Sequence, residues 1–282
     1  MSIIPESSPV HKQLHLLARD ARIVIFSGLP GIGKSLYINE FYSLAIQEKR
    51  EVTVIQWDLA RKAFETEKIM ERYPMGDGTV HNGMKLLAGA FIRDNILKWS
   101  EESRKEDLLL IEAPLVGHRF IEVAELSDDP ELEEILADES CSIIVPIPSK
   151  KVRKLIEEER ARQVDEDAKV WMGAKPSVMI MLWRMVYNIA LEFGYDAPAD
   201  DNPEYDPEVI EFVFRQICKH RHFVPLHIDE VFTVPEQSES ELHKLESVVA
   251  SKEEAESYFD TVSEAYPHDE MIDQRVEAWY HQ

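Results

Sequence analysis

The fold is decided by the stretch Arg22-Ile-Val-Ile-Phe-Ser-Gly-Leu-Pro-Gly-Ile-Gly-Lys-Ser35. A short β-branched run ends in a glycine-rich loop, and the loop opens onto an amphipathic segment that begins at Lys34 and extends to about Gln47. This order of strand, loop and helix is the context in which the pattern G-x-x-x-x-G-K-[ST] binds phosphate. The sequence therefore predicts a phosphate-binding loop between residues 28 and 35.

Each residue type in this loop has a separate part in holding phosphate. The glycines permit backbone conformations that other residues avoid, so that successive N–H groups turn inward around an anion, and the following helix adds its positive end. Lys34 is expected to reach the β- and γ-phosphates of ATP, and the Ser35 hydroxyl to hold Mg²⁺. The alternative is a glycine turn that binds no ligand. The predicted nucleotide-binding residues of the loop are Gly28, Pro30, Gly31, Ile32, Gly33, Lys34, Ser35 and Leu36.

Length and composition indicate a globular protein with one large domain, or one large domain and a small appendage. The chain has 282 residues, 44% of them apolar, so it can bury a full core. Its 54 acidic residues exceed its 31 basic residues, which gives a formal net charge of −23. Such a surface repels nucleic-acid backbones unless a local basic groove overrides the field. General nucleic-acid binding is therefore disfavoured, and ATP, itself an anion, requires a local positive pocket near the loop.

Cysteine usage and the N-terminal residues indicate a reducing compartment. Cys141 and Cys218 have no partners at metal-ligand spacing, so we interpret both as core thiols. The N-terminus lacks a basic segment followed by an apolar core, and the longest apolar run, residues 178–186, is too short to cross a bilayer. We therefore expect a cytoplasmic protein that does not enter a membrane.

A second β-rich run, residues 51–58, ends in Asp58, and Arg61 follows three positions later. Ligands of open α/β sheets bind beyond the carboxyl ends of the strands, so Asp58 is expected to face the same crevice as the glycine loop. There it could accept a proton from an attacking hydroxyl, while Arg61 holds an acceptor oxygen or the phosphoryl group. The alternative is that Asp58 only caps the next helix.

A third strand is predicted over residues 107–115, in a continuous apolar run that contains Glu112, as expected of a strand buried on both faces. Glu112 occupies the place of the acid that many phosphate-loop proteins put near Mg²⁺, although Ala-Pro follows it where motor ATPases have a second acid. Its alternative is a buried acid satisfied by backbone N–H groups. His118 and Arg119, which close this segment, are weaker candidates.

The most basic helical stretch, residues 148–162, directly follows a predicted fourth strand, residues 141–147. We favour a lid over residues 148–175 in which Arg153 and Arg162 bind the nucleotide and Arg160 neutralises charge during transfer. The alternative is a solvated helix with Glu–Arg pairs at helical spacing.

The remaining chain divides into further predicted parts. We expect a leader helix within residues 1–20, a main domain over 21–235 with a helical insert at about 176–220, and an acidic helical extension over 236–282. A fifth strand is predicted over residues 222–229.

With these residues aligned, the chain resembles P-loop kinases that phosphorylate hydroxyls, most closely the branch of polynucleotide 5′-hydroxyl kinases, zeta-type toxin kinases and chloramphenicol phosphotransferases. The resemblance covers roughly residues 21–235. It implies a P-loop NTPase fold of the kinase type, an α/β/α three-layer sandwich with five parallel strands in the order 2-3-1-4-5. It also implies that Asp58 is the general base, that Arg61 contacts the acceptor or phosphate, and that Arg153, Arg160 or Arg162 serves as a lid arginine. The insert between residues 164 and 225 and the acidic tail depart from the family pattern.

Two functional hypotheses follow. In the first, the protein is an ATP-dependent kinase that transfers the γ-phosphate to a hydroxyl of a small, nucleoside-like or other metabolite, with Lys34, Asp58, Arg61 and Arg160 as catalytic residues and Mg²⁺ held by Ser35 and Glu112. In the second, it is a nucleotide-dependent switch or regulatory ATPase that binds a protein partner through its acidic C-terminal region. The single acid at Glu112 disfavours the second hypothesis. A polynucleotide end kinase is disfavoured by the net charge.

Overall fold

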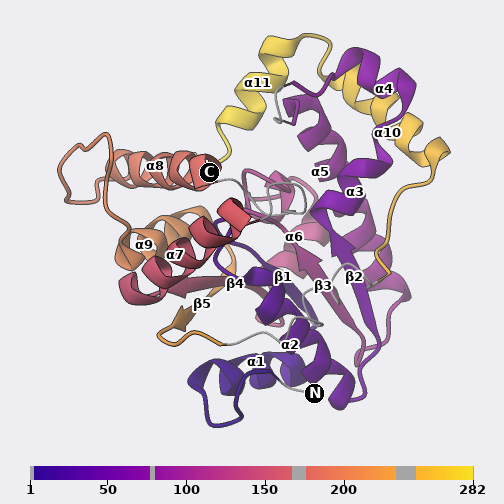
Figure 1. Ribbon diagram of the computed structural model, residues 1–282. Coiled ribbons are helices and arrows are strands. Elements are labelled where there is room, and N and C mark those ends of the chain that lie inside the picture. Colours follow the sequence, from indigo (N-terminus) through magenta and orange to yellow (C-terminus); the bar gives the residue numbers. More distant parts are fainter. Residues whose placement is uncertain (1–2, 77–79, 167–175, 233–245, 282) are drawn as a thin grey trace.

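A computed structural model describes residues 3–76, 80–166, 176–232 and 246–281, with the side chains of residues 160–166, 176 and 177 outside the described part. Its centre is a five-stranded parallel sheet in the order β2-β3-β1-β4-β5 (Figure 1), which confirms the predicted strand order. The strands are β1 Ile23–Phe26, β2 Val52–Gln56, β3 Leu108–Glu112, β4 Cys141–Pro148 and β5 His222–Ile228.

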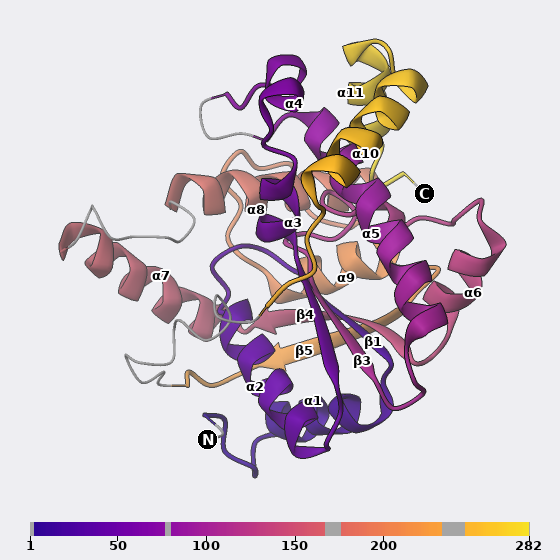
Figure 2. The same cartoon turned by 90° about the vertical axis from the view of Figure 1, so that its right-hand side faces the viewer.

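Helices cover both faces of the sheet, so the α/β architecture has three layers (Figures 1 and 2). Alternate strand residues point to opposite sides, as the period of two requires. Ile23 and Ile25 of β1 face one core, whereas Val24 and Phe26 face the other. The helices are α1 Pro9–Asp20, α2 Lys34–Gln47, α3 Trp57–Ala63, α4 Glu67–Arg72, α5 Asn82–Glu102, α6 Pro130–Ala137, α7 Lys150–Glu166, α8 Pro176–Glu192, α9 Pro207–Ile217, α10 Lys252–Ala265 and α11 Asp269–Glu277, with a 3₁₀ turn η1 at Ile121–Val123.

The smaller core lies between the sheet and helices α1 and α2. Leu14 and Ala18 of α1 and Ile38 and Phe41 of α2 are buried there. Because α2 begins at Lys34 and ends at Gln47, the helix predicted to follow the glycine loop is confirmed at both ends. The loop is therefore held between a buried strand and a buried helix.

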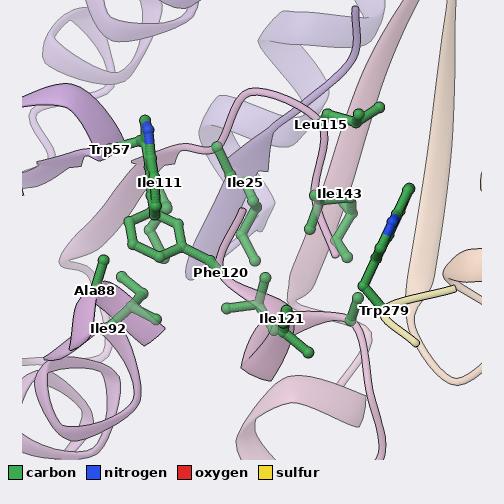
Figure 3. Close-up of a cluster of buried hydrophobic side chains, with 14 of the residues drawn as sticks. Ile25, Trp57, Ala88, Ile92, Ile111, Leu115, Phe120, Ile121, Ile143 and Trp279 are labelled. Atoms are coloured by element: carbon green, nitrogen blue, oxygen red, sulfur yellow. The ribbon is translucent and has the colours of Figure 1, made fainter. Parts of the chain in front are cut away.

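The larger core lies on the opposite face and contains helices α3, α5, α6 and α9 (Figure 3). Cys141 and Cys218 are both buried and unpaired in it, as predicted for core thiols. Trp57, Phe120 and Trp279 also belong to this cluster, although they come from distant parts of the sequence. These aromatic side chains join α3, the segment after β3 and the end of the chain.

Two strands, β2 and β3, end earlier in the structure than the sequence predicts. The second strand ends at Gln56, not at Asp58, because helix α3 already begins at Trp57. Asp58 therefore lies in the first turn of α3, where a carboxylate is stabilised by the positive end of the helix. The third strand ends at Glu112, two residues before Pro114, which has no N–H to donate to a strand.

The described C-terminal residues pack against the main body of the protein. Helices α10 and α11 lie beside α4 and α5 in both views (Figures 1 and 2). Upstream of them, Ser247 pairs with Val54 of the edge strand β2, and the Val248 N–H donates to the Val54 carbonyl at 2.9 Å. The Gln56 N–H donates to the Ser247 hydroxyl at 3.1 Å. The segment around Ser247 thus runs along the free side of β2.

Over the described ranges of the chain, no helix combines the length and the apolar character that a membrane crossing requires.

Candidate functional site

The glycine loop connects β1 to α2 at the carboxyl edge of the sheet. Gly28, Gly31 and Gly33 have φ values of 121°, 83° and 83°, all in the region that favours glycine. A Cβ at Gly28 would lie 2.9 Å from Cδ1 of Ile32, so that position excludes larger residues sterically as well. The backbone conformation that the sequence predicts for these glycines is therefore present.

Lys34 and the start of α2 form the closed end of the loop. The Lys34 side chain is buried, and its Nζ donates to the carbonyls of Gly28 and Leu29, both at 3.2 Å. Helix α2 has no acidic residue in its first turn and no side-chain hydrogen bond at its N-cap, Gly33. Its positive end is thus not neutralised locally, and Ser35 beside it is exposed.

Glu112 stands at the end of β3, directly between β1 and β2. Phe26 of β1 and Gln56 of β2 are its register partners on the two sides. The glycine loop and Asp58 each begin two residues beyond those partners. The topology therefore places the end of β3, with Glu112, between the strands that lead to the loop and to Asp58.

Electrostatic coupling links Glu112 to both neighbours. Burial raises the pKa of Glu112 to about 7, with the Asp58 charge also raising it, whereas the Lys34 charge and the Trp57 N–H lower it. The hydrogen bond from Trp57 matches the alternative interpretation of Glu112 as an acid satisfied by backbone. Lys34 and Asp58 nevertheless each lie within electrostatic range of Glu112.

Two arginines border Asp58. Arg61, one helical turn further along α3, is buried; it pairs with Glu65, and its Nη1 also lies 3.6 Å from the sulfur of Met75. Among the described residues, none accepts a hydrogen bond from the buried Arg61 Nε. Burial and the Arg61 charge lower the pKa of Arg119 to about 10, while the Asp58 charge raises it. Arg119 thus belongs to the same charged group as Asp58 and Arg61.

A strained turn, residues 115–120, presents Arg119 to this group. Leu115 and Phe120 have φ values of 61° and 53° although neither is glycine, and Gly117 between them has 89°. The Val116 N–H donates to the Ser27 hydroxyl at 2.6 Å, which ties the turn to the start of the glycine loop. Left-handed non-glycine residues are costly and concentrate at functional sites. The turn therefore joins the loop to Arg119 in one rigid unit.

Gly117 offers a test of how tightly this turn is packed. A Cβ at Gly117 would lie 2.7 Å from the Trp279 ring in addition to having an unfavourable φ, whereas Gly194 has φ 85° with nothing within 4 Å. Gly194→Ala should cost about 1–2 kcal/mol of unfolding free energy from backbone strain alone. Gly117→Ala should cost roughly 2–5 kcal/mol because overpacking adds to the strain. Urea unfolding of both variants measures the difference, and equal losses would contradict the close contact with Trp279.

The Arg119 guanidinium is held by contacts with Trp57 and His118. It lies over the Trp57 ring at 5.3 Å, and its Nη1 contacts the His118 Nδ1 at 2.8 Å and donates to the His118 carbonyl at 3.1 Å. The His118 Nε2 lies 3.0 Å from the Lys85 Nζ. Burial, with the Arg119 and Lys85 charges, lowers the pKa of His118 to about 2, so its ring is neutral. A neutral histidine therefore bridges two cations, Arg119 and Lys85, and the first of them is coupled to Asp58.

The sequence interpretation gave His118 and Arg119 only a minor place and did not single out Lys85. The signal that points to Arg119 is the His-Arg pair directly after Gly117, in a segment that follows a buried strand ending in an acid. Lys85 carries no such signal, because it interrupts the apolar stripe of α5 in the way that a surface lysine would.

The predicted lid arginines are only partly described. Arg153 of α7 is buried; its Nε donates to Glu157 at 2.7 Å, and its guanidinium lies over the Tyr205 ring at 5.3 Å. The pair with Glu157 is the helical spacing that the alternative interpretation named. Within the described part of the chain, the buried Arg153 Nη1 has no hydrogen-bond partner. Arg160 and Arg162 lie in α7, but their side chains are outside the described residues.

Metal ligands of the usual protein kind are not clustered. Among the residues that the structure describes, no group of three or more His, Cys, Asp or Glu side chains could hold a metal ion. Magnesium at nucleotide sites needs fewer protein ligands, because it keeps several waters and binds phosphate oxygens. Ser35 and Glu112 remain the candidates by position.

A scan against protein-family models and a search of curated proteins each found no match to this chain.

Proposed function

We propose that this protein is an ATP-dependent phosphotransferase that moves the γ-phosphate of ATP to a hydroxyl of a small-molecule acceptor, in the manner of the P-loop kinases. The observation that carries the proposal is the arrangement at one edge of the sheet. A glycine loop with three left-handed glycines ends in Lys34, and across from it Asp58 is coupled electrostatically to Glu112 and Arg119. Anion-binding loop, buried cations and exposed carboxylate are the parts that phosphoryl transfer to a hydroxyl needs.

The residues at the loop fit a magnesium-bound triphosphate. The left-handed glycines allow backbone N–H groups to turn toward an anion, and the unneutralised end of α2 favours one. Ser35 and Glu112 would hold Mg²⁺. The buried Nε of Arg61, for which no described residue is a partner, is a further donor suited to a phosphate or acceptor oxygen. When bound, Mg²⁺ would supply charge neutralisation on the phosphates.

In this proposal each side chain has one task in the transfer. Lys34 leaves its own loop carbonyls to bind the β- and γ-phosphate oxygens. Asp58 accepts the proton of the acceptor hydroxyl as its oxygen bonds to phosphorus and ADP leaves. Arg61 and Arg119 hold the negative charge that spreads over the transferring group. The neutral His118 and the Trp57 ring keep the Arg119 guanidinium in place.

The direct test is a transfer assay with γ-labelled ATP, Mg²⁺ and a set of small hydroxyl compounds, together with calorimetric titration of a non-hydrolysable ATP analogue. The proposal predicts saturable nucleotide binding and label in an acceptor product. Release of free phosphate without an acceptor product would favour the regulatory ATPase, and failure to bind nucleotide would overturn both functions.

A variant of Glu112 distinguishes a role of this acid in binding Mg²⁺ from a purely structural role. Its raised pKa means that the folded state prefers the neutral form, so ionisation reduces stability as the pH rises from about 4.5 to about 7. Glu112→Gln should therefore raise the unfolding free energy by up to about 3 kcal/mol at pH 8, and the gain should vanish near pH 4.5. The same variant should weaken Mg²⁺-dependent nucleotide binding.

Glu122 is the matched control for this variant. It is half-buried in η1, between the buried residues Ile121 and Val123, and burial of its carboxyl raises its pKa to about 7 as well. Glu122→Gln should show the same pH-dependent gain in chemical unfolding and unchanged nucleotide binding. If both variants left nucleotide binding unchanged, Glu112 would have no part in holding Mg²⁺.

A further inference from the structure

A cavity of about 940 Å³ opens beside the charged group, away from the glycine loop. Its walls come from the start of α5, the strained turn, α8 and the end of the chain, which meet only in the folded protein. This volume lies in the range of pockets that hold small organic ligands. The lining residues are Asn82, Lys85, His118, Ile180, Met181, Arg184, Met185, Asn188, Ile189, Glu192, Val276, Glu277, Trp279 and Tyr280.

Lys85 is the buried charge of this cavity. Its side chain is only 7% exposed, and its Nζ contacts the neutral His118 at 3.0 Å. In the described part of the chain, no carboxylate forms an ion pair with it, and the nearest acids, Asp273 and Glu277, are exposed. A buried ammonium beside a neutral ring and a second cation, Arg119, is electrostatically suited to an anionic ligand group.

Two other charged groups of the cavity are already engaged, whereas Glu277, which also lines the cavity, is an exposed carboxylate. Glu192 accepts a hydrogen bond from the Tyr280 hydroxyl at 3.0 Å, and Arg184 donates to Asn202 at 3.1 Å. The lining also includes apolar side chains, among them thioethers and the Trp279 ring. Thioether and aromatic side chains adapt to flat apolar surfaces and are common at binding sites.

We propose that this cavity binds an organic anion with an apolar, ring-bearing body, whose anionic group contacts Lys85, and that this anion is the acceptor. The binding site stands on the cavity alone. Its identification with the acceptor rests on the proposed function, and on the turn: His118 lines the cavity, while the next residue, Arg119, is coupled to Asp58.

The test uses two fluorescent probes of the same shape and different charge. These are 1-anilinonaphthalene-8-sulfonate and uncharged N-phenyl-1-naphthylamine, titrated without nucleotide into the full chain. Lys85→Met should weaken sulfonate binding by about 10-fold or more, since a charge-assisted contact is lost, and leave the uncharged probe within about 2-fold. Lys98→Met, at an exposed position of the same helix, should change neither affinity.

A pH series adds a readout that a merely structural lysine would not give. Burial and the Arg119 charge lower the pKa of Lys85 to about 7, although the charges of Asp273 and Glu277 raise it. Lys85 therefore loses its charge above that pH. Of the groups facing it, His118 stays neutral between pH 6 and 8.5, and Asp273 and Glu277 are exposed. Sulfonate affinity should therefore fall over this range in the native protein and stay level in Lys85→Arg, which remains charged.

The probe titrations test the anion site independently of the transfer assay. Equal sulfonate binding by the native protein and Lys85→Met, or equal losses for both probes, would overturn the anion site. Lys34→Met should leave sulfonate binding unchanged, so the site can be verified even if no phosphoryl transfer occurs. Where transfer does occur, Lys85→Met should raise KM for the acceptor about 10-fold and leave KM for ATP unchanged. If the acceptor proved neutral or cationic and its KM were the same in Lys85→Met as in the native protein, the acceptor would not be the anion bound in this cavity.

Discussion

Replacing Lys34 by methionine is expected to reduce phosphoryl transfer by at least about 10³-fold. The ammonium is buried at the closed end of the glycine loop, where its charge acts through little water, and methionine preserves the volume of the side chain without the charge. The hydrogen bonds to the Gly28 and Leu29 carbonyls, which methionine cannot make, lie within the loop itself. We therefore expect the midpoint of thermal unfolding to change little.

The measurement is single-turnover transfer from labelled ATP, with binding of the ATP analogue measured separately. Lys98→Met is the matched control, because it removes an exposed lysine from α5 and should transfer phosphate at the native rate. If Lys34→Met retained native turnover, the glycine loop would not be the site of the phosphate donor.

The second large effect is expected at Asp58. Asparagine has the same shape as aspartate but cannot take a proton from a hydroxyl, so Asp58→Asn should lower kcat by about 10²- to 10⁴-fold. Asp58 lies in the first turn of α3, whose N-cap residue is Gln56, and its side chain is exposed. Binding of ATP should therefore remain within a few-fold of native, and unfolding should change by less than about 1 kcal/mol.

The control for this variant is Asp201→Asn, at an exposed position in the loop before α9. Because the Asp58 charge favours the protonated forms of both Arg119 and Glu112, the pH dependence of kcat should be recorded together with the rate. Full activity of Asp58→Asn at every pH would exclude Asp58 as the base and favour the alternative, in which the aspartate only stabilises the start of a helix.

The sequence predicts the central part of the fold well because that part is encoded locally. The glycines at 28, 31 and 33 are the residues that left-handed conformations favour, and the strand and helix on either side have clear apolar patterns. The strand order came from the resemblance to P-loop kinases, not from the pattern itself. The end of β2 was misplaced because Trp57 suits a strand equally well, and only its packing against Phe120 commits it to α3.

The surroundings of Asp58 could not be predicted from the same local signals. Arg119 reaches its place through a turn whose left-handed residues, Leu115 and Phe120, are not of the type that marks such turns. Lys85 becomes a cavity residue only because Trp279, far away in sequence, closes the opposite wall. Both positions depend on contacts between distant segments, which periodicity and spacing do not report.

The contact of Ser247 with β2 has a consequence for how copies of this protein meet one another. Strand β2 is at the border of the sheet, where free backbone groups would offer a template for another strand. The pairing of Ser247 and Val248 with Val54, and of Ser247 with Gln56, occupies these groups within the same chain. The segment around Ser247 therefore reduces the number of free backbone groups on β2 with which a strand of another copy could pair.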